Sequence, residues 1–234
     1  MTTSTCNILL EGNIGSGKSE FISYLRSLTD ITLIPEPVNE WTNYHGYNML
    51  EMMYKSPGEN TFAFQSLVLL KQWKLFQKQV KSIRMFERSP FSSFYVFVES
   101  QKHLLKSYEY ELLAEWFDFV TNTMEMSNKI NLVVYIRTDP LIAYERTRKR
   151  DRKGEESISL ETITKIHNLH ENWLIKKEKP IPGILLTIDG NQDRGSMEME
   201  ALALYNAIKL TTPRHGTVRT GAAACPAARG QEWP

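Results

Sequence analysis

The sequence has little cysteine and no long apolar run. Its 234 residues include two cysteines, Cys6 and Cys225, which form neither a disulfide framework nor a zinc-binding spacing. No stretch of about eighteen apolar residues occurs, so no membrane span is predicted. The polar residues before the first apolar run are too few for a signal peptide or an Arg-rich transit sequence. These absences favour the cytosol or nucleus, and a cytoplasmic location is our prediction.

An excess of charge of either sign is also missing. The chain has 28 Lys and Arg residues against 27 Asp and Glu residues, which gives a formal net charge of +1 at pH 7. No global field therefore draws it to nucleic acid or to an anionic membrane, and neither is expected as a partner. The length fits one α/β domain with a good-sized core, or at most two small domains.

What the chain does have is a phosphate-binding loop, Gly12-Asn13-Ile14-Gly15-Ser16-Gly17-Lys18-Ser19. An apolar run over residues 6–10 precedes this loop and an amphipathic stretch over residues 20–28 follows it, which predicts a strand, a Gly-rich turn and a helix. Backbone N–H groups and the helix dipole then favour an anion. Lys18 could reach the β- and γ-phosphates, and the Ser19 hydroxyl could bind Mg²⁺. The loop predicts a nucleoside triphosphate site.

Strands and helices alternate along the chain, which is typical of a parallel sheet with helices on both faces. Apolar runs predict strands over residues 6–10, 31–34, 82–86, 131–136 and 184–188. Helical spacing predicts helices over residues 61–80, 91–106, 109–126 and 160–177. We expect one domain over residues 1–210. Residues 211–234 are rich in Pro, Gly and Ala without an apolar period, which predicts a weakly ordered tail.

Polar residues follow three of these strands, at the edge where a parallel sheet binds its ligands. They are Lys18 with Ser19, then Glu36, then Glu87 with Arg88. GTPases, ATPases and small-molecule kinases all share the phosphate loop. The guanine-reading Asn-Lys-x-Asp motif is missing, because residues 128–131 read Asn-Lys-Ile-Asn. No transporter signature loop is present, and the chain is too small for a motor.

The combination resembles the deoxyribonucleoside kinase family, which includes deoxycytidine, deoxyguanosine and mitochondrial thymidine kinases and a multisubstrate insect enzyme. The matching segments keep their order from residue 5 to about residue 190: the phosphate loop, Glu36-Pro37-Val38 with Trp41, Phe64-Gln65-Ser66, Glu87-Arg88-Ser89, Tyr135-Ile136-Arg137-Thr138, Glu155-Glu156, and His167 to Leu174. The resemblance implies a P-loop kinase fold, ATP and Mg²⁺ as cofactors, and a homodimer. The apolar faces of residues 91–106 and 109–120 could form that dimer.

The resemblance also implies catalytic roles. Glu36 would accept the proton of a 5′-hydroxyl as this oxygen attacks the γ-phosphoryl group. Glu87 would hold Mg²⁺ together with Ser19, directly or through water. Arg88 would contact the 5′-oxygen and steady Glu36. The simpler alternative is that Glu36 caps the next segment or that the acids and Arg88 form structural pairs.

A nucleoside pocket is implied in the same way. Gln65 would bind the Watson–Crick edge of the base, since its amide both donates and accepts. Phe97 would stack on the ring, and Tyr54 with Glu156 would hold the 3′-hydroxyl. The remaining pocket wall would be Trp41, Met53, Phe64 and Val68, which by themselves are simply expected core residues.

The basic segment over residues 146–153 lies where these kinases carry a lid over the triphosphate. The resemblance implies that Arg146, Arg150 and Arg152 contact the phosphates. A nucleic-acid patch or a localisation signal is the alternative. One extra residue between Arg152 and the acid pair leaves open whether Glu155 or Glu156 meets the sugar. His167 and His170 could share a metal only with a third ligand, so we expect a surface or core role for both.

Substrate choice is predicted from two positions near the base. Deoxycytidine- and purine-directed members place an arginine and an aspartate there, whereas this chain has Gln72 and Ser93. The absence of that charged pair predicts a broad deoxynucleoside kinase that prefers thymidine and deoxycytidine. Two alternatives are a nucleoside monophosphate kinase of the thymidylate type, which Glu36 disfavours because it would repel a phosphate, and a nucleotide-binding protein without catalysis.

Overall fold

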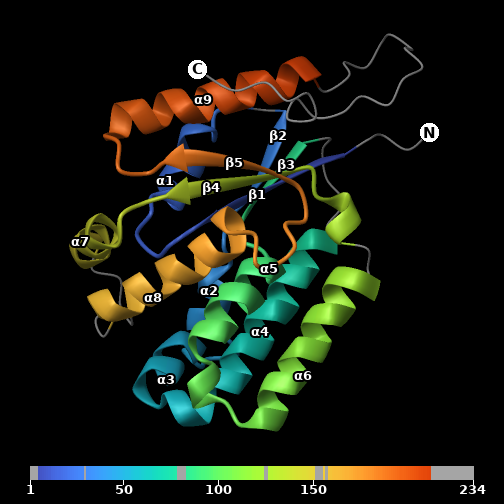
Figure 1. Ribbon diagram of the computed structural model, residues 1–234, viewed down its shortest axis with the longest axis vertical. Helices are drawn as coiled ribbons and strands as arrows, with labels where there is room; N and C mark the ends of the chain where they lie inside the picture. Colours follow the sequence, from blue (N-terminus) through green and yellow to red (C-terminus); the bar gives the residue numbers. More distant parts are fainter. Residues whose placement is uncertain are drawn as a thin grey trace.

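Five parallel strands form a single sheet in the order β2-β3-β1-β4-β5 (Figure 1). The computed structural model describes residues 5–28, 30–77, 83–123, 126–150, 155 and 158–211. The strands are β1 Cys6–Gly12, β2 Ile31–Ile34, β3 Ile83–Glu87, β4 Leu132–Arg137 and β5 Ile184–Asp189. The predicted α/β fold with a five-stranded parallel sheet is confirmed, and each strand lies within two residues of its predicted bounds.

Helices cover both faces of the sheet (Figure 1). On one face α1 and α9 pack against the central strands through a cluster that includes Phe21, Leu25, Leu204 and Ile208. On the other face lies a larger aromatic cluster from α4, α6 and α8. The helices are α1 Lys18–Tyr24, α2 Val38–Thr42, α3 Met49–Lys55, α4 Pro57–Gln77, α5 Pro90–Ser92, α6 Ser107–Asp118, α7 Pro140–Arg150, α8 Leu160–His170 and α9 Arg194–Thr211.

Short π- and 3₁₀-helical turns interrupt three of the predicted helices. Residues 91–106 are not one helix, because α5 passes into a π-turn at Ser93–Val98 and a separate 3₁₀ turn follows at Lys102–Leu104. The other turns are η3 Phe119–Thr123 after α6, η4 Ser127–Lys129 before β4, and η5 Glu171–Ile175 after α8. A π-turn adds a residue to one helical turn, which an apolar spacing of 3.6 does not reveal.

The last helix, α9, was not predicted. It buries Met197, Ala201, Leu204, Tyr205 and Ile208 against the sheet and α1. Residues 212–234 lie outside the described residues, as do Arg152 and Glu156. Among the residues described, no helix has both the length and the apolar character needed to cross a bilayer.

Gly15 is the position in the loop where the backbone leaves no room for a side chain. Its φ is +74°, and a Cβ there would lie 2.1 Å from the carbonyl oxygen of Ala143 on α7. We expect Gly15→Ala to lower the free energy of unfolding by about 2–4 kcal/mol. The alanine would be strained at this positive φ, and its Cβ would also overlap with the backbone of α7. Urea denaturation measures this.

Gly58 provides the matched control for that substitution. It lies in the first turn of α4 with nothing within 4 Å of a built Cβ. Gly58→Ala is expected to stabilise the protein by about 0.5–1 kcal/mol. Equal stability of the Gly15→Ala variant and the wild type would contradict the close approach of the loop to α7.

Candidate active site

A cavity of about 1270 Å³ opens at the carboxyl ends of β1, β2 and β3. One end is formed by the phosphate loop and by α7, and the other end by α3, α4 and the turn after α5. Most of the predicted site residues line it: Ile14, Gly15, Ser16, Gly17, Lys18, Ser19, Glu36, Trp41, Met53, Tyr54, Phe64, Gln65, Val68, Glu87, Arg88, Ser93, Phe97, Arg146 and Arg150. The fold thus gathers into one cavity residues that are spread over more than half of the sequence.

The phosphate loop holds its lysine tightly. Lys18 begins α1 and is 5% exposed, and its Nζ donates to the carbonyl oxygens of Gly12 at 3.0 Å and Asn13 at 2.6 Å. Burial lowers the pKa of Lys18, and the nearby Arg88 adds to that effect. Asn13 is not among the residues that line the cavity, and its side chain connects the loop to α8, because Nδ2 donates to the Ile163 carbonyl at 2.9 Å.

The two predicted metal ligands lie against each other at the end of β3. The Ser19 hydroxyl donates to Oε1 of Glu87 at 2.7 Å, and Oε2 of Glu87 accepts from the backbone N–H of Glu36 at 3.4 Å. No group of three His, Cys, Asp or Glu side chains suited to a metal occurs within the described part of the chain. A hydroxyl and one carboxylate are the kind of sparse oxygen set that Mg²⁺ shares with waters and phosphates.

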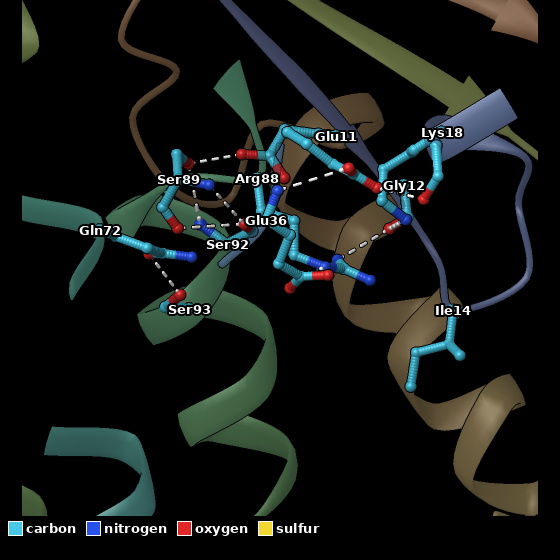
Figure 2. A network of polar contacts seen from close by, with 12 residues as sticks. Glu11, Gly12, Ile14, Lys18, Glu36, Gln72, Arg88, Ser89, Ser92 and Ser93 are labelled. Carbon is cyan, nitrogen blue, oxygen red and sulfur yellow. Dashed lines mark hydrogen bonds and ion pairs between the residues drawn. The ribbon is translucent and has the colours of Figure 1, made fainter. Parts of the chain in front are cut away.

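Arg88 connects the loop with Glu36 (Figure 2). Its Nε lies 2.9 Å from Oε1 of Glu36, and its Nη1 donates to the Gly12 carbonyl at 3.0 Å. The guanidinium also lies over the Phe97 ring, 4.5 Å from the centroid. Its backbone has a φ of +66°, an uncommon value for a residue with a side chain. Such strain is often found where a site dictates the direction of one side chain.

Next to Arg88 and Ser89 lies Glu11, an acid that the sequence interpretation missed (Figure 2). Glu11 is fully buried on β1, and its Oε1 accepts a hydrogen bond from the Ser89 hydroxyl. Burial raises its pKa to about 7 in spite of Arg88 and Lys18 nearby. Ser89 in turn caps α5 and forms a capping box with Ser92. Glu11 therefore anchors the turn that carries Arg88.

Glu11→Gln is expected to change how stability depends on pH. The folded-state pKa of Glu11, about 7, is above its ordinary value of 4.5, so the folded protein holds this proton more tightly than the unfolded chain. Stability from Glu11 is therefore full below about pH 4.5 and is lost as the pH rises through about 7. Glutamine keeps the hydrogen-bond acceptor and does not titrate.

Relative to the wild type, the Gln variant should gain roughly 2 kcal/mol of unfolding free energy between pH 5 and pH 8. Urea denaturation across this range measures the gain. A difference between the two proteins that stays constant with pH would show that Glu11 does not titrate in this window.

The far end of the cavity is apolar with a few polar groups. Trp41 packs edge-on against Phe64 at 6.0 Å, and Met53 and Val68 belong to the same buried cluster. Gln65 is 2% exposed, and its Nε2 donates to Oε1 of Gln101 at 2.8 Å. Gln101 was not predicted from the sequence, because nothing in the residues around it distinguishes it from a surface glutamine.

The sugar-binding residues predicted from the resemblance are brought together in part. Burial raises the pKa of the Tyr54 hydroxyl, and the carboxylate of Glu155 raises it further. Glu155 is itself buried, lines the cavity and pairs with Arg150. Of the two acids that the sequence left open, Glu155 therefore lies at this end of the cavity, and Glu156 lies outside the described residues.

Gln72 and Ser93 do not both face the cavity. The Ser93 hydroxyl lines it and donates to Oε1 of Gln72 at 2.7 Å, whereas Gln72 lies behind Ser93 in the protein interior. Only Ser93 is therefore placed for direct contact. The predicted position of both residues near the base stays a prediction.

Two arginines of the predicted lid lie on α7. Arg146 donates to the backbone carbonyls of Gly190 at 2.7 Å and Gln192 at 3.3 Å, while Arg150 pairs with Glu155. Arg194, at the start of α9, also lines the cavity and pairs with Glu20. It was missed because α9 itself was not predicted.

His170 lies in the core. It is fully buried, its ring stacks on Tyr135 at 5.7 Å, and burial lowers its pKa to about 3. His167 lies 3.9 Å from Glu171, so the two histidines point to different partners. The expectation of a core or surface role instead of a shared metal agrees with these contacts for His170.

A phosphate loop at the end of the first strand, facing basic side chains across a cavity with a carboxylate, defines a P-loop phosphotransferase. The sequence model of the deoxynucleoside kinase family matches residues 8–209. Human mitochondrial thymidine kinase 2 is 36% identical over 212 residues, which cover 89% of this chain and 78% of that protein. Human deoxycytidine kinase is 29% identical over 220 residues, covering 80% and 84%. Mitochondrial deoxyguanosine kinase of Xenopus laevis is 27% identical over 219 residues, covering 80% and 83%.

The chain belongs to the deoxynucleoside kinase family. It is an enzyme, a kinase whose phosphoryl donor is ATP.

Proposed function

We propose that this kinase transfers the γ-phosphoryl group of ATP to the 5′-hydroxyl of deoxyribonucleosides, with thymidine and deoxycytidine preferred. The observation that carries the proposal is the position of Glu36. It lies in the cavity with the phosphate loop on one side and an apolar pocket on the other, held by Arg88 at 2.9 Å. A carboxylate at this point suits a hydroxyl acceptor, whereas it would repel an acceptor phosphate.

In the proposed mechanism Glu36 accepts the proton of the 5′-hydroxyl as that oxygen attacks the γ-phosphorus. Arg88 keeps Glu36 oriented and neutralises charge on the transferring group, because its guanidinium touches both Glu36 and the loop carbonyl of Gly12. When ATP binds, the Nζ of Lys18 would donate hydrogen bonds to phosphate oxygens in place of the two loop carbonyl oxygens. Arg146 and Arg150 on α7, with Arg152 further along the chain, would contact the triphosphate as parts of a lid.

We propose Mg²⁺ as the metal, held by the hydroxyl of Ser19 and the carboxylate of Glu87. When bound, it would neutralise phosphate charge during transfer. The two side chains already share a hydrogen bond, so the oxygen atoms that would face the ion lie close together. Glu87 is 7% exposed, which limits the access of competing ligands.

The proposed preference for pyrimidines is supported by the two uncharged residues, Gln72 and Ser93, at the positions where deoxycytidine- and purine-directed kinases have an arginine and an aspartate. Ser93 and Gln72 form a neutral hydrogen-bonded pair there. A buried charge without a partner would be costly, and this neutral pair avoids that cost. Recognition of the base is then left to the amide of Gln65 and to stacking on Phe97. Tyr54 and an acid from the pair at residues 155–156 would hold the 3′-hydroxyl.

Initial rates with thymidine, deoxycytidine, deoxyadenosine and deoxyguanosine, each at the same low concentration with Mg-ATP, test the proposed preference. We expect both pyrimidine nucleosides to be turned over faster than either purine nucleoside. Faster phosphorylation of deoxyguanosine than of both pyrimidines would overturn the preference. It would leave the hydroxyl-acceptor reaction intact.

We also propose a homodimer, formed through α6. This helix and the first residue of η3 expose an apolar stripe of Tyr108, Leu112, Trp116 and Phe119, with 59%, 44%, 53% and 44% of each residue accessible. Figure 1 shows α6 on the side of the molecule away from α7 and α8, so a partner there leaves the cavity open. An apolar stripe of this kind is typical of a protein interface.

Trp116→Glu is expected to convert the dimer into a monomer, because it places a charge at the centre of the stripe. Light scattering after gel filtration measures the molar mass. Met199→Glu on α9 is the control, since Met199 is 66% exposed and lies away from the stripe. A wild-type monomer, or an unchanged mass for the Trp116 variant, would contradict an α6 interface.

The cytoplasmic location of the protein stays a prediction.

A further inference from the structure

The amide of Gln65 is held by a chain of directed contacts. Gln65 lies on α4, and its Nε2 donates to Oε1 of Gln101 at 2.8 Å. The Nε2 of Gln101 then donates to the sulfur of Met53 on α3 at 3.4 Å. All three residues line the cavity.

Met53 determines which way both amides face. A thioether sulfur accepts hydrogen bonds and does not donate them, so the contact requires the NH₂ group of Gln101 to face Met53. The oxygen of Gln101 then faces Gln65, and only the NH₂ group of Gln65 can meet it. Turning Gln65 over would place two oxygens together unless Gln101 also turned over and lost its contact with Met53.

One atom of Gln65 remains without a partner. Its Oε1 is buried and makes no hydrogen bond within the described part of the chain. Leaving a buried acceptor unpaired is costly, so a bound ligand that donates a hydrogen bond there is favoured. With one hydrogen of Nε2 given to Gln101, Gln65 offers a ligand one acceptor and one remaining donor in a fixed order.

The order matters because thymine and cytosine present opposite patterns at the same two positions. Thymine donates from N3 and accepts at O4, whereas cytosine accepts at N3 and donates from its amino group at position 4. A glutamine can match both bases only by turning its amide over. An amide held in one orientation matches one of the two bases better.

We propose that Gln101 is a specificity-determining residue that fixes the orientation of the Gln65 amide and thereby makes the enzyme distinguish thymidine from deoxycytidine. The inference rests on the proposed function, because it takes Gln65 to meet the base. Reversing the amide loses about one hydrogen bond, so the two values of kcat/KM should differ by between about two- and tenfold.

The test compares kcat/KM for thymidine and deoxycytidine in the wild type and in three variants. Gln101→Met keeps the length of the side chain and removes its amide. If this variant does not fold, Gln101→Leu replaces it, because leucine also lacks the amide and has a shorter side chain. Gln101→Glu keeps an oxygen that accepts from Gln65. We expect the wild-type ratio to move towards one, by between about two- and tenfold, in the Met or Leu variant and to be retained in the Glu variant.

The ratio of kcat/KM for thymidine to kcat/KM for deoxycytidine separates this role from a merely structural one, because a loosened pocket would lower kcat/KM for both nucleosides together. A wild-type ratio of one, or a Met variant that loses the same factor on both nucleosides, would overturn the inference while leaving the proposed function standing. A wild type that phosphorylates neither nucleoside would overturn the proposed function, and the inference with it.

Discussion

Glu36→Gln should lower kcat by about 10²–10⁴-fold, since a positioned general base contributes about that much to proton transfer. Glutamine has nearly the same shape and can still accept a hydrogen bond from Arg88, so the pocket should keep its form. ATP binding should change little, because Lys18 and the loop N–H groups are untouched. Single-turnover phosphorylation of thymidine measures the chemical step, and equilibrium titration measures ATP affinity.

Glu40→Gln is the matched control for that experiment. Glu40 lies four residues after Glu36, but its side chain is 47% exposed and pairs with Lys71 outside the cavity. It should leave kcat within about twofold of the wild type, as expected for a surface ion pair. A Glu36→Gln enzyme that keeps kcat within a few-fold would mean that another group accepts the proton.

Arg88→Lys should lower kcat by about 10²–10³-fold, the usual cost of removing one group that stabilises the transition state. Lysine keeps the charge, but it lacks the planar fork. Arg88 donates to Glu36 and to the Gly12 carbonyl from two different nitrogens while its guanidinium carbon lies over the Phe97 ring, and the single nitrogen of a lysine cannot reproduce this arrangement. Both residues would experience the same φ of +66°, so the comparison isolates the head group from the backbone strain.

Arg137→Lys serves as the control for this second prediction. Arg137 ends β4, forms an ion pair with Glu171 at 2.8 Å and does not line the cavity. It should leave kcat unchanged. An Arg88→Lys enzyme with wild-type turnover and normal thermal stability would show that charge alone suffices, and that the contacts of the guanidinium are structural.

The sequence was sufficient to predict the sheet because its strands are buried. A strand covered on both faces is mostly apolar, and β1 and β4 contain the apolar stretches Ile8–Leu10 and Leu132–Ile136 next to recognisable polar ends. The phosphate loop was equally clear, since its residues are adjacent in sequence. Glu36, Glu87 and Arg88 could be assigned because parallel strands bring their carboxyl ends to one edge.

The residues that the sequence did not reveal depend on contacts between distant segments. Glu11 is distinguished by burial beside Ser89, 78 positions away along the chain, and Gln101 by a contact with Gln65, 36 positions away. Likewise, α9 has buried residues at helical spacing, but the exposed Met199 and Leu202 between them and Leu210 after them obscure that spacing. In the segment predicted as one helix over residues 91–106, the π-turn at Ser93–Val98 breaks the regular helical spacing of the apolar residues.

The central claim is that the acceptor is a hydroxyl group. It is tested most directly by incubating the enzyme with Mg-ATP and, in separate reactions, thymidine, 5′-deoxythymidine and thymidine 5′-monophosphate, and by identifying the products with mass spectrometry. The account predicts that thymidine gives its 5′-monophosphate with one ADP formed per product, and that the other two compounds give no phosphorylated product. Formation of the diphosphate from thymidine 5′-monophosphate, with thymidine left unchanged, would contradict it.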